Sequence, residues 1–274
     1  TGNAFKLTKE KYPPSPPYFK GRFSNGLVWV DYFASLLNAK LFSYAYGGAS
    51  CDSVLIKSSV GPDDVVVPGI AQQVDSFLLG DYKKFSCETT LVVFGTIILD
   101  YDRPAGSGSV EKVRESIVNT DPAKIVASVG ERMEKLYKKG FKNFLLFISL
   151  PVGAFLTPTE QSYPPDLIKT LSEKQVLHNQ YTLEAMNSFK KKHPDAILYL
   201  IKLDEIISAV FSPDSLKELG ISVLNVGCIP DNGYAGKKSV VCKEPEKYAF
   251  YDNYTAVNTN LHKKVAEHVV PLVK

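Results

Sequence analysis

The stretch Leu91–Leu99, LVVFGTIIL, decides the fold class of this 274-residue chain. It is a nearly continuous apolar run that ends at Asp100. A run of this length fits a buried strand and is too short to cross a membrane as a helix. Apolar residues without alternation are typical of a parallel strand that helices cover on both faces. The stretch therefore predicts a parallel sheet inside an α/β protein.

Working outward from this stretch, strand patterns alternate with helix patterns along the whole chain. Strands are predicted at 41–46, 89–99, 143–150 and 196–201, and helices at 27–39, 70–79, 110–118, 122–139, 166–192, 203–211, 215–220 and 258–272. Asn25 precedes the first helix, and Asp121 and Gly140 are placed to cap and to end the helix between them. The alternation predicts a three-layer α/β/α sandwich with a mainly parallel, flavodoxin-like sheet. In such sheets ligands bind at the carboxyl ends of the strands.

The composition indicates a chain that can bury a large core. Hydrophobic residues make up 45% of it, and the net charge is only +3. This balance gives no reason to expect binding to nucleic acid or to an anionic membrane. Two basic clusters, Lys135–Lys142 and Lys190–His193, fall where helices are predicted to end, and cations there stabilise the helix dipole. No apolar run reaches the length of a membrane span.

The four cysteines and one glycosylation sequon indicate whether the protein is secreted. Cys51, Cys87, Cys228 and Cys242 form no CxxC pair and show no zinc-ligand spacing, so no metal is expected. Their even number fits two disulfides in a secreted protein, with Cys228 and Cys242 the first candidate pair because they close a short loop. Buried free thiols are the alternative. Asn253-Tyr254-Thr255 is a possible N-glycosylation site.

Two motifs connect the chain to a known family. PPYFKGRFSNGLVWVDYFA (16–34) followed by SYAYGGAS (43–50) resembles the GDSL-type lipases and esterases of the SGNH hydrolase superfamily. The closest resemblance is to the fungal secreted branch, which includes carbohydrate-esterase-like acylhydrolases. It extends over nearly the whole chain and implies a single SGNH-like domain, residues 1–274. Members of this family need no cofactor, and none is expected here.

The resemblance also indicates what stands before the first residue. In the family the first strand ends in Gly-Asp-Ser-Leu-Ser-Asp, and Thr-Gly-Asn follows at once. Thr1-Gly2-Asn3 resembles that continuation. The chain is therefore expected to lack the first strand of its sheet together with the nucleophilic Ser. That strand normally lies in the middle of the sheet, so its absence would leave neighbouring backbone groups unpaired.

The oxyanion-binding positions of the family can be matched to two residues. Gly48 matches the glycine whose backbone N–H binds the oxyanion, although a tight turn that needs a positive φ would equally require glycine. The family's next block carries an Asn side chain as second donor, and here Ile97 takes its place. In another alignment Leu99 takes it. Neither side chain donates a hydrogen bond, and loss of one such donor costs roughly 100- to 1000-fold in rate.

The triad acid and base of the family fall near the last helix. The family motif is Asp-x-x-His-Pro, and Asp252 matches the acid that orients the histidine. Thr255 stands at the histidine position, or Ala256 in a register shifted by one. Neither accepts a proton near neutral pH. His262 is the nearest histidine along the chain, but it falls inside the predicted last helix, where a surface role suffices.

These observations favour a secreted ester hydrolase homologue that has lost catalysis and keeps a cleft for a carbohydrate or a small ester. Tyrosines near the strand ends would suit a sugar, or would simply pack in the core. The first alternative is an active serine ester hydrolase of which this is an N-terminally incomplete sequence. The second alternative is a non-catalytic secreted interaction protein. The sequence alone does not choose the acyl group, the sugar or the oligomeric state.

Overall fold

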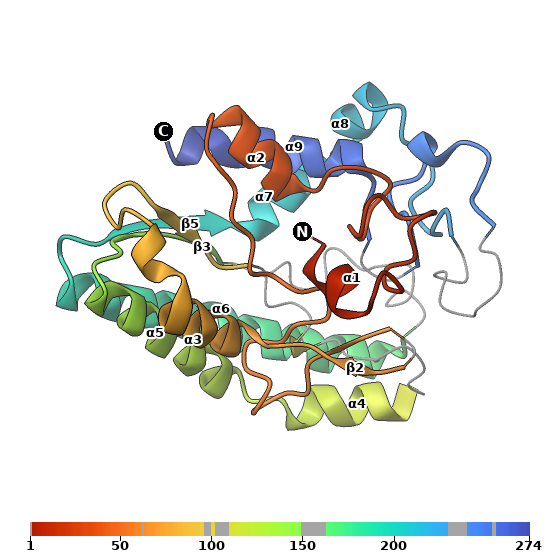
Figure 1. Cartoon of the computed structure of the whole chain (residues 1–274). Helices are drawn as coiled ribbons and strands as arrows, with labels where there is room; N and C mark the ends of the chain where they lie inside the picture. Colours follow the sequence, from red (N-terminus) through yellow and green to blue (C-terminus); the bar gives the residue numbers. More distant parts are fainter. Residues whose placement is uncertain are drawn as a thin grey trace.

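A parallel three-stranded sheet lies at the centre of the molecule (Figure 1). The computed structural model describes residues 2–61, 63–95, 100–101, 110–148, 163–229, 240–253 and 256–274. Strands β3 (Leu91–Val93), β4 (Asn143–Ile148) and β5 (Ile197–Lys202) pair in parallel, in the order β3-β4-β5. The predicted parallel sheet is confirmed for these strands, and the second half of the Leu91–Leu99 run lies outside the described residues.

The middle strand explains why the chain needs helices on both faces. Every residue of β4 after Asn143 is buried. Successive side chains of a strand point to opposite faces. Phe147 contacts Trp29, with ring centroids 5.1 Å apart, whereas Phe144 contacts Phe189 on the other face, with centroids 5.9 Å apart. One strand therefore contributes to two separate apolar layers.

The helices form these two covering layers (Figure 1). On one face lie α3 (Ile70–Gly80), α5 (Pro122–Lys138) and α6 (Pro165–Lys192), with α4 (Val110–Asn119) packed on α6. On the other face lie α2 (Trp29–Leu36), α7 (Leu203–Val210) and α9 (Thr259–Val269). The predicted three-layer α/β/α arrangement is confirmed. Smaller elements are α1 (Asn3–Leu7), α8 (Pro213–Glu218), the antiparallel pair β1 (Ser59–Val60) and β2 (Val65–Val66), and the 3₁₀ turns 82–84, 245–247 and 270–272.

The helix boundaries follow local capping chemistry. Asp121 caps α5, since its carboxylate accepts a hydrogen bond from the Ala123 N–H at 3.0 Å. Gly140 ends the same helix with a φ of 101°, as predicted. Asn25 does not start α2, which begins at Trp29. Its side chain accepts from the Thr259 N–H at 2.8 Å and so helps to cap α9, whose N-cap residue is Asn258.

The start of the chain is attached to its end by further contacts of this kind. The Ser24 hydroxyl donates to the Val257 carbonyl at 2.8 Å, and Tyr32 and Thr259 share a hydroxyl hydrogen bond of 2.9 Å. Helices α2 and α9 pack together along these contacts. The N-terminal and C-terminal segments therefore form one unit of the covering layer.

The segment 41–46 differs from its prediction as a strand. It carries no strand assignment. The Asn3 side-chain amide donates to the carbonyls of Ser43 and Ala45, at 2.9 and 3.0 Å. A strand needs a neighbouring strand for its backbone groups, and a side chain satisfies two of them here. Within the part of the chain that the structure describes, no strand pairs with this segment.

One of the two expected disulfides forms. Cys228 and Cys242 are bonded, with an S–S distance of 2.07 Å, as their spacing predicted. The expectation of a second bridge is wrong, because Cys51 and Cys87 are free thiols. Cys51 is buried beside the Asp100 carboxylate, which together with burial raises the pKa of its thiol. Cys87 instead directs its sulfur to the Lys139 carbonyl at 3.3 Å.

Candidate functional site

The turn that leads into α9 carries the candidate triad acid. Isolated bridges join Ile229 to Asp252 and Phe250 to Val257, and the Tyr251 N–H donates to the Ala256 carbonyl at 2.6 Å. These contacts fold residues 250–257 back on themselves. The Asp252 side chain consequently points inward and is only 3% exposed.

The Asp252 carboxylate accepts hydrogen bonds from Tyr18 and from the backbone of Ala256, both among the described residues. The Tyr18 hydroxyl donates to Oδ2 at 2.8 Å, and the Ala256 N–H donates to Oδ1 at 3.0 Å. In the family pattern an imidazole N–H would donate to this carboxylate. A phenol can stabilise the negative charge in the same way, but its pKa near 10 keeps it from removing a proton near neutral pH.

Sequence reasoning missed Tyr18. It ends the Pro-rich stretch 12–18, yet its ring is only 2% exposed. The ring packs edge-on against Tyr251, with centroids 5.4 Å apart, and the Tyr251 hydroxyl donates to the Pro17 carbonyl at 2.8 Å. Burial raises the pKa of Tyr251. No local pattern signals this contact, because 234 residues separate Tyr18 from Asp252.

Gly48, the candidate oxyanion donor, occupies a position that only glycine fits. Its φ is 79°, and a Cβ atom would lie 2.0 Å from the Ser59 carbonyl oxygen. The tight turn explains this glycine by itself. Its N–H as an oxyanion donor therefore stays a prediction.

The Phe23 ring contacts two apolar clusters, one near Asp252 in the chain and one near Gly48. Phe23 packs against the apolar cluster of Tyr18 and Tyr251 and also against the cluster of Val60 and Tyr46 that flanks the Gly48 turn. The structure thus brings the two matched positions to the same region. Thr255 and Ile97, like the alternative position Leu99, lie outside the described residues.

The histidines have other contacts. His178 on α6 is buried, with its Nδ1 2.8 Å from the Tyr101 hydroxyl, and burial lowers its pKa to about 4. His262 on α9 is half-buried, and its pKa is likewise lowered to about 4 by burial. His193 and Glu134 form an ion-pair contact of 2.9 Å, and His268 Nδ1 lies 2.8 Å from the Lys264 carbonyl.

Two of the tyrosines near the strand ends are buried in the core. Tyr101 is fully buried against His178, and Tyr251 is buried against Tyr18. Tyr44 donates to the Asp81 carboxylate at 2.9 Å, and its pKa is raised to about 12 by partial burial and by that carboxylate. Tyr254 lies outside the described residues. Core packing, the alternative reading of these rings, accounts for Tyr101 and Tyr251.

Asn253, the glycosylation candidate, is half-buried. Its side-chain oxygen accepts from the Gly227 N–H at 2.6 Å. That bond attaches the turn to the segment before the disulfide at Cys228. Whether a glycan is attached stays a prediction.

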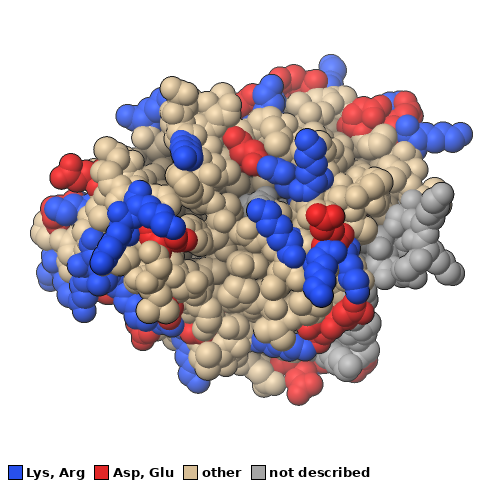
Figure 2. All heavy atoms as spheres, viewed as in Figure 1, with Lys and Arg blue, Asp and Glu red and all other residues tan. Residues whose placement is uncertain are grey.

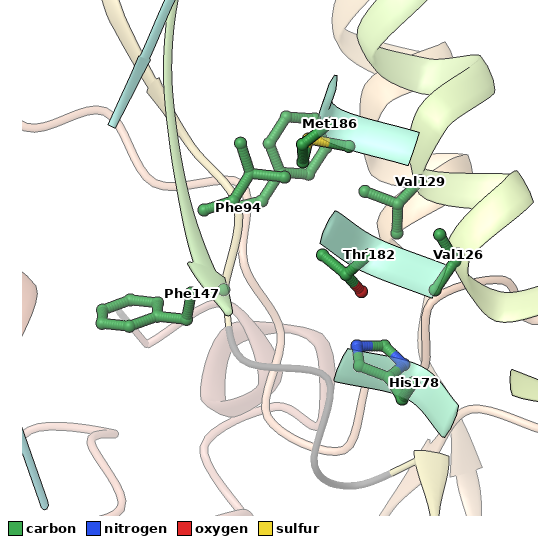
Figure 3. Close-up of a pocket in the computed structure, with 9 residues that line it drawn as sticks. Phe94, Val126, Val129, Phe147, His178, Thr182 and Met186 are labelled. Atoms are coloured by element: carbon green, nitrogen blue, oxygen red, sulfur yellow. The ribbon is translucent and has the colours of Figure 1, made fainter. Parts of the chain in front are cut away.

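A small pocket lies between the sheet and helices α5 and α6, close to the carboxyl ends of β3 and β4 (Figure 3). Its walls are mostly apolar, including Phe94, Phe147 and Met186, with the polar side chains of His178 and Thr182 among them. The Thr182 hydroxyl is buried and has no hydrogen-bond partner among the residues that the structure describes. The space holds about one water molecule, which is too small for an ester substrate.

Two absences hold for the described part of the chain. No cluster of three or more His, Cys, Asp or Glu side chains is arranged to hold a metal ion there. None of the helices in the described segments is both long and apolar enough to cross a membrane.

The fold and the site together fit the SGNH class. Helices cover both faces of a parallel sheet, a glycine turn follows the segment 41–46, and an Asp turn precedes the last helix. Sequence comparisons support this superfamily. The chain is 29% identical over 280 residues to a thermolabile hemolysin of Vibrio parahaemolyticus, covering 98% of this chain and 60% of that protein.

A second relative points the same way. The chain is 24% identical over 205 residues to a phosphatidylcholine-sterol acyltransferase of Aeromonas hydrophila, covering 75% of this chain and 55% of that protein. The chain thus spans little more than half the length of these two curated relatives. No family model matches it.

Proposed function

We propose that the chain is an SGNH-type ester hydrolase homologue that binds a lipid-like or other small ester and has lost the base needed to cleave it. One observation carries the proposal. The Asp252 carboxylate, which would orient a catalytic histidine, accepts hydrogen bonds from Tyr18 and from the Ala256 N–H. The replacements at Thr255 and Ile97 in the sequence support the same conclusion.

The substrate class rests on the relatives and on the buried tyrosines. One relative's name gives phosphatidylcholine as an acyl donor, and phosphatidylcholine is a lipid ester. A carbohydrate is less well supported, since Tyr101 and Tyr251 turn inward. Secretion is supported by the Cys228–Cys242 disulfide, which persists in oxidising compartments. The fungal branch stays a prediction, because both relatives come from bacteria.

The test compares binding with turnover. Purified chain is mixed with p-nitrophenyl butyrate for turnover and with dibutyryl phosphatidylcholine for binding, followed by Trp29 fluorescence or calorimetry. We expect saturable binding without turnover. Turnover that a serine-directed phosphonate abolishes would contradict the loss of catalysis. Absence of binding by a folded chain would contradict the ester-binding role.

A second candidate function is an active hydrolase whose nucleophilic Ser comes from residues that precede Thr1 in a longer protein. The Asn3 contacts with Ser43 and Ala45 favour it, because they hold the start of the described chain beside the unpaired segment 41–46. A strand entering there would supply that segment with backbone partners. The same assays on a protein extended by its natural upstream residues decide between the two. Ester turnover in the extended protein alone would favour this candidate.

A gain-of-function variant tests the register. Replacing Thr255→His and Ile97→Asn in the extended protein restores the base and the second oxyanion donor. If the alignment is right, turnover rises by roughly 100-fold or more. The matched control is Ala256→His, which places the imidazole one residue away. Equal activity of the two histidine variants would show that the register is wrong.

A further inference from the structure

The two basic clusters singled out in the sequence come together at one edge of the sheet. The Lys192 ammonium lies 2.9 Å from Glu134, and the rings of Tyr137 and His193 lie 3.9 Å apart, so the ends of α5 and α6 touch. Because β3, β4 and β5 are parallel, the segments before each of them meet at the amino edge. Figure 2 shows blue side chains gathered on the left, where Figure 1 places the ends of α3 and α5.

Helix dipoles explain lysines at such an edge, but acidic neighbours neutralise only some of them. Lys84 pairs with Asp81, and Lys142 pairs with Asp195. Other lysines here are exposed and have no acidic partner among the residues that the structure describes: Lys40, Lys83, Lys138, Lys139 and Lys191. Their charge is available to an external anion, although the net charge of the whole chain is small.

Exposed apolar side chains stand among these cations. Leu79, in the last turn of α3, is 90% exposed, and Phe42 is 50% exposed. The Lys40 ammonium lies 4.8 Å from the Phe42 ring centroid. Lys83 and Lys139 lie 6.0 and 5.1 Å from the Tyr82 ring. We define the amino-edge patch as Lys40, Phe42, Leu79, Tyr82, Lys83 and Lys139.

We propose that the amino-edge patch docks on an anionic lipid surface. Lysine ammonium groups suit lipid phosphates, while a leucine and an aromatic ring suit the boundary between headgroups and acyl chains. A polyanion such as a nucleic acid would use the cations but not Leu79. The proposal does not depend on the ester-binding function. The Gly48 turn comes after the segment 41–46 and the Asp252 turn comes after β5, whereas the amino-edge patch is built from residues that precede the strands.

Vesicle sedimentation tests the proposal. The chain is mixed with vesicles of phosphatidylcholine and phosphatidylglycerol in equal parts, or of phosphatidylcholine alone. We expect binding to the mixed vesicles, little binding to the neutral ones, and release at about 1 M salt, where charges are screened within about 3 Å. Absence of binding to the mixed vesicles, or equal binding to both kinds, would overturn the proposal.

Variants locate the surface. Lys83→Gln with Lys139→Gln should weaken partitioning about 25-fold, at about fivefold for each lysine. The matched control, Lys124→Gln with Lys169→Gln, removes two exposed lysines near the opposite ends of α5 and α6 and should leave binding unchanged. Equal weakening by both pairs would mean non-specific attraction and would overturn the proposal.

An apolar variant separates a lipid surface from a polyanion. Leu79→Ser should weaken vesicle binding about fivefold, whereas Val240→Ser, a control at 76% exposure, should not. Heparin serves as the polyanion probe. Tight heparin binding together with an unchanged Leu79→Ser variant would assign the patch to a polyanion and overturn the lipid proposal. Circular dichroism checks that each variant is folded.

Discussion

The strand β4 and the turn around Asp252 are both buried, but they are held by different forces. β4 contacts two aromatic layers, with Phe144 on one face and Phe147 on the other, and it pairs with β3 on one side and with β5 along its whole length on the other. The Asp252 turn is fixed by a few polar contacts, of which the one from Tyr18 spans 234 residues. The core therefore gains stability from area, whereas the turn gains its geometry from individual hydrogen bonds.

Because of this difference, substitutions in the two regions should affect the protein differently. Removing core volume lowers the stability of the whole domain. Removing one hydrogen bond to a buried carboxylate costs less, but it can reorient the candidate triad acid. Stability and ligand binding, measured on the same variants, can therefore separate the regions.

The largest effect is expected at Phe144, whose side chain is fully buried. Phe144→Ala should lower the free energy of unfolding by about 3–5 kcal/mol, through lost burial and the cavity that remains. Urea denaturation measures it. Phe42→Ala makes the same chemical change on a half-exposed ring and should cost much less. Equal losses would mean that the two-layer core is wrong.

Lowering the pH should destabilise the protein through His178, which belongs to the core and not to the Asp252 turn. Burial lowers its folded pKa to about 4, while the unfolded value is near 6.5, so the unfolded state binds the proton first as the pH falls. The free energy of unfolding is therefore highest above about pH 6.5 and falls by about 3 kcal/mol as the pH is lowered toward 4. His178→Gln should flatten that part of the curve. Parallel curves for variant and wild type would contradict the buried position.

Tyr18→Phe probes the turn directly. It removes the hydroxyl that donates to the buried Asp252 carboxylate and should cost about 1.5–3 kcal/mol. Tyr251→Phe is the matched control, since it removes a bond to the neutral Pro17 carbonyl and should cost about 0.5–1.5 kcal/mol. Thermal or urea unfolding measures both. A larger loss of unfolding free energy for Tyr251→Phe than for Tyr18→Phe would contradict the hydrogen bond from Tyr18 to the Asp252 carboxylate.

The last comparison is between two glycines. Gly48→Ala should cost more than the roughly 1–2 kcal/mol of its left-handed backbone, because the new Cβ would lie 2.0 Å from the Ser59 carbonyl oxygen. Gly130→Ala, in the middle of α5 with open space around it, should gain about 1 kcal/mol. Differential scanning calorimetry measures both shifts. Stabilisation at Gly48 would mean that the turn has another conformation.

The sequence predicted what local patterns determine. Strands β3, β4 and β5 with the helices between them, the Asp121 cap, the Gly140 helix end and the Cys228–Cys242 disulfide all depend on nearby residues, and all are confirmed within the described part of the chain. The fold class followed from the buried strands, because a run that is apolar on both faces requires two covering layers.

The errors arose where distant segments decide the outcome. Segment 41–46 has the composition of a strand but pairs with no strand among the described residues, and Asn25 helps to cap α9 rather than capping α2. The Tyr18 contact with Asp252 leaves no mark in either local sequence. The candidate site was therefore located through the family resemblance, while its actual donors were found only in three dimensions.

The cap that Asn25 provides for α9 has a consequence for synthesis in the cell. Asn25 is synthesised 234 residues before its partner Thr259. Helices α2 and α9 complete one covering layer only when both are present. The layer over that face of β4 therefore cannot be completed until α9 has been made, long after β4 itself.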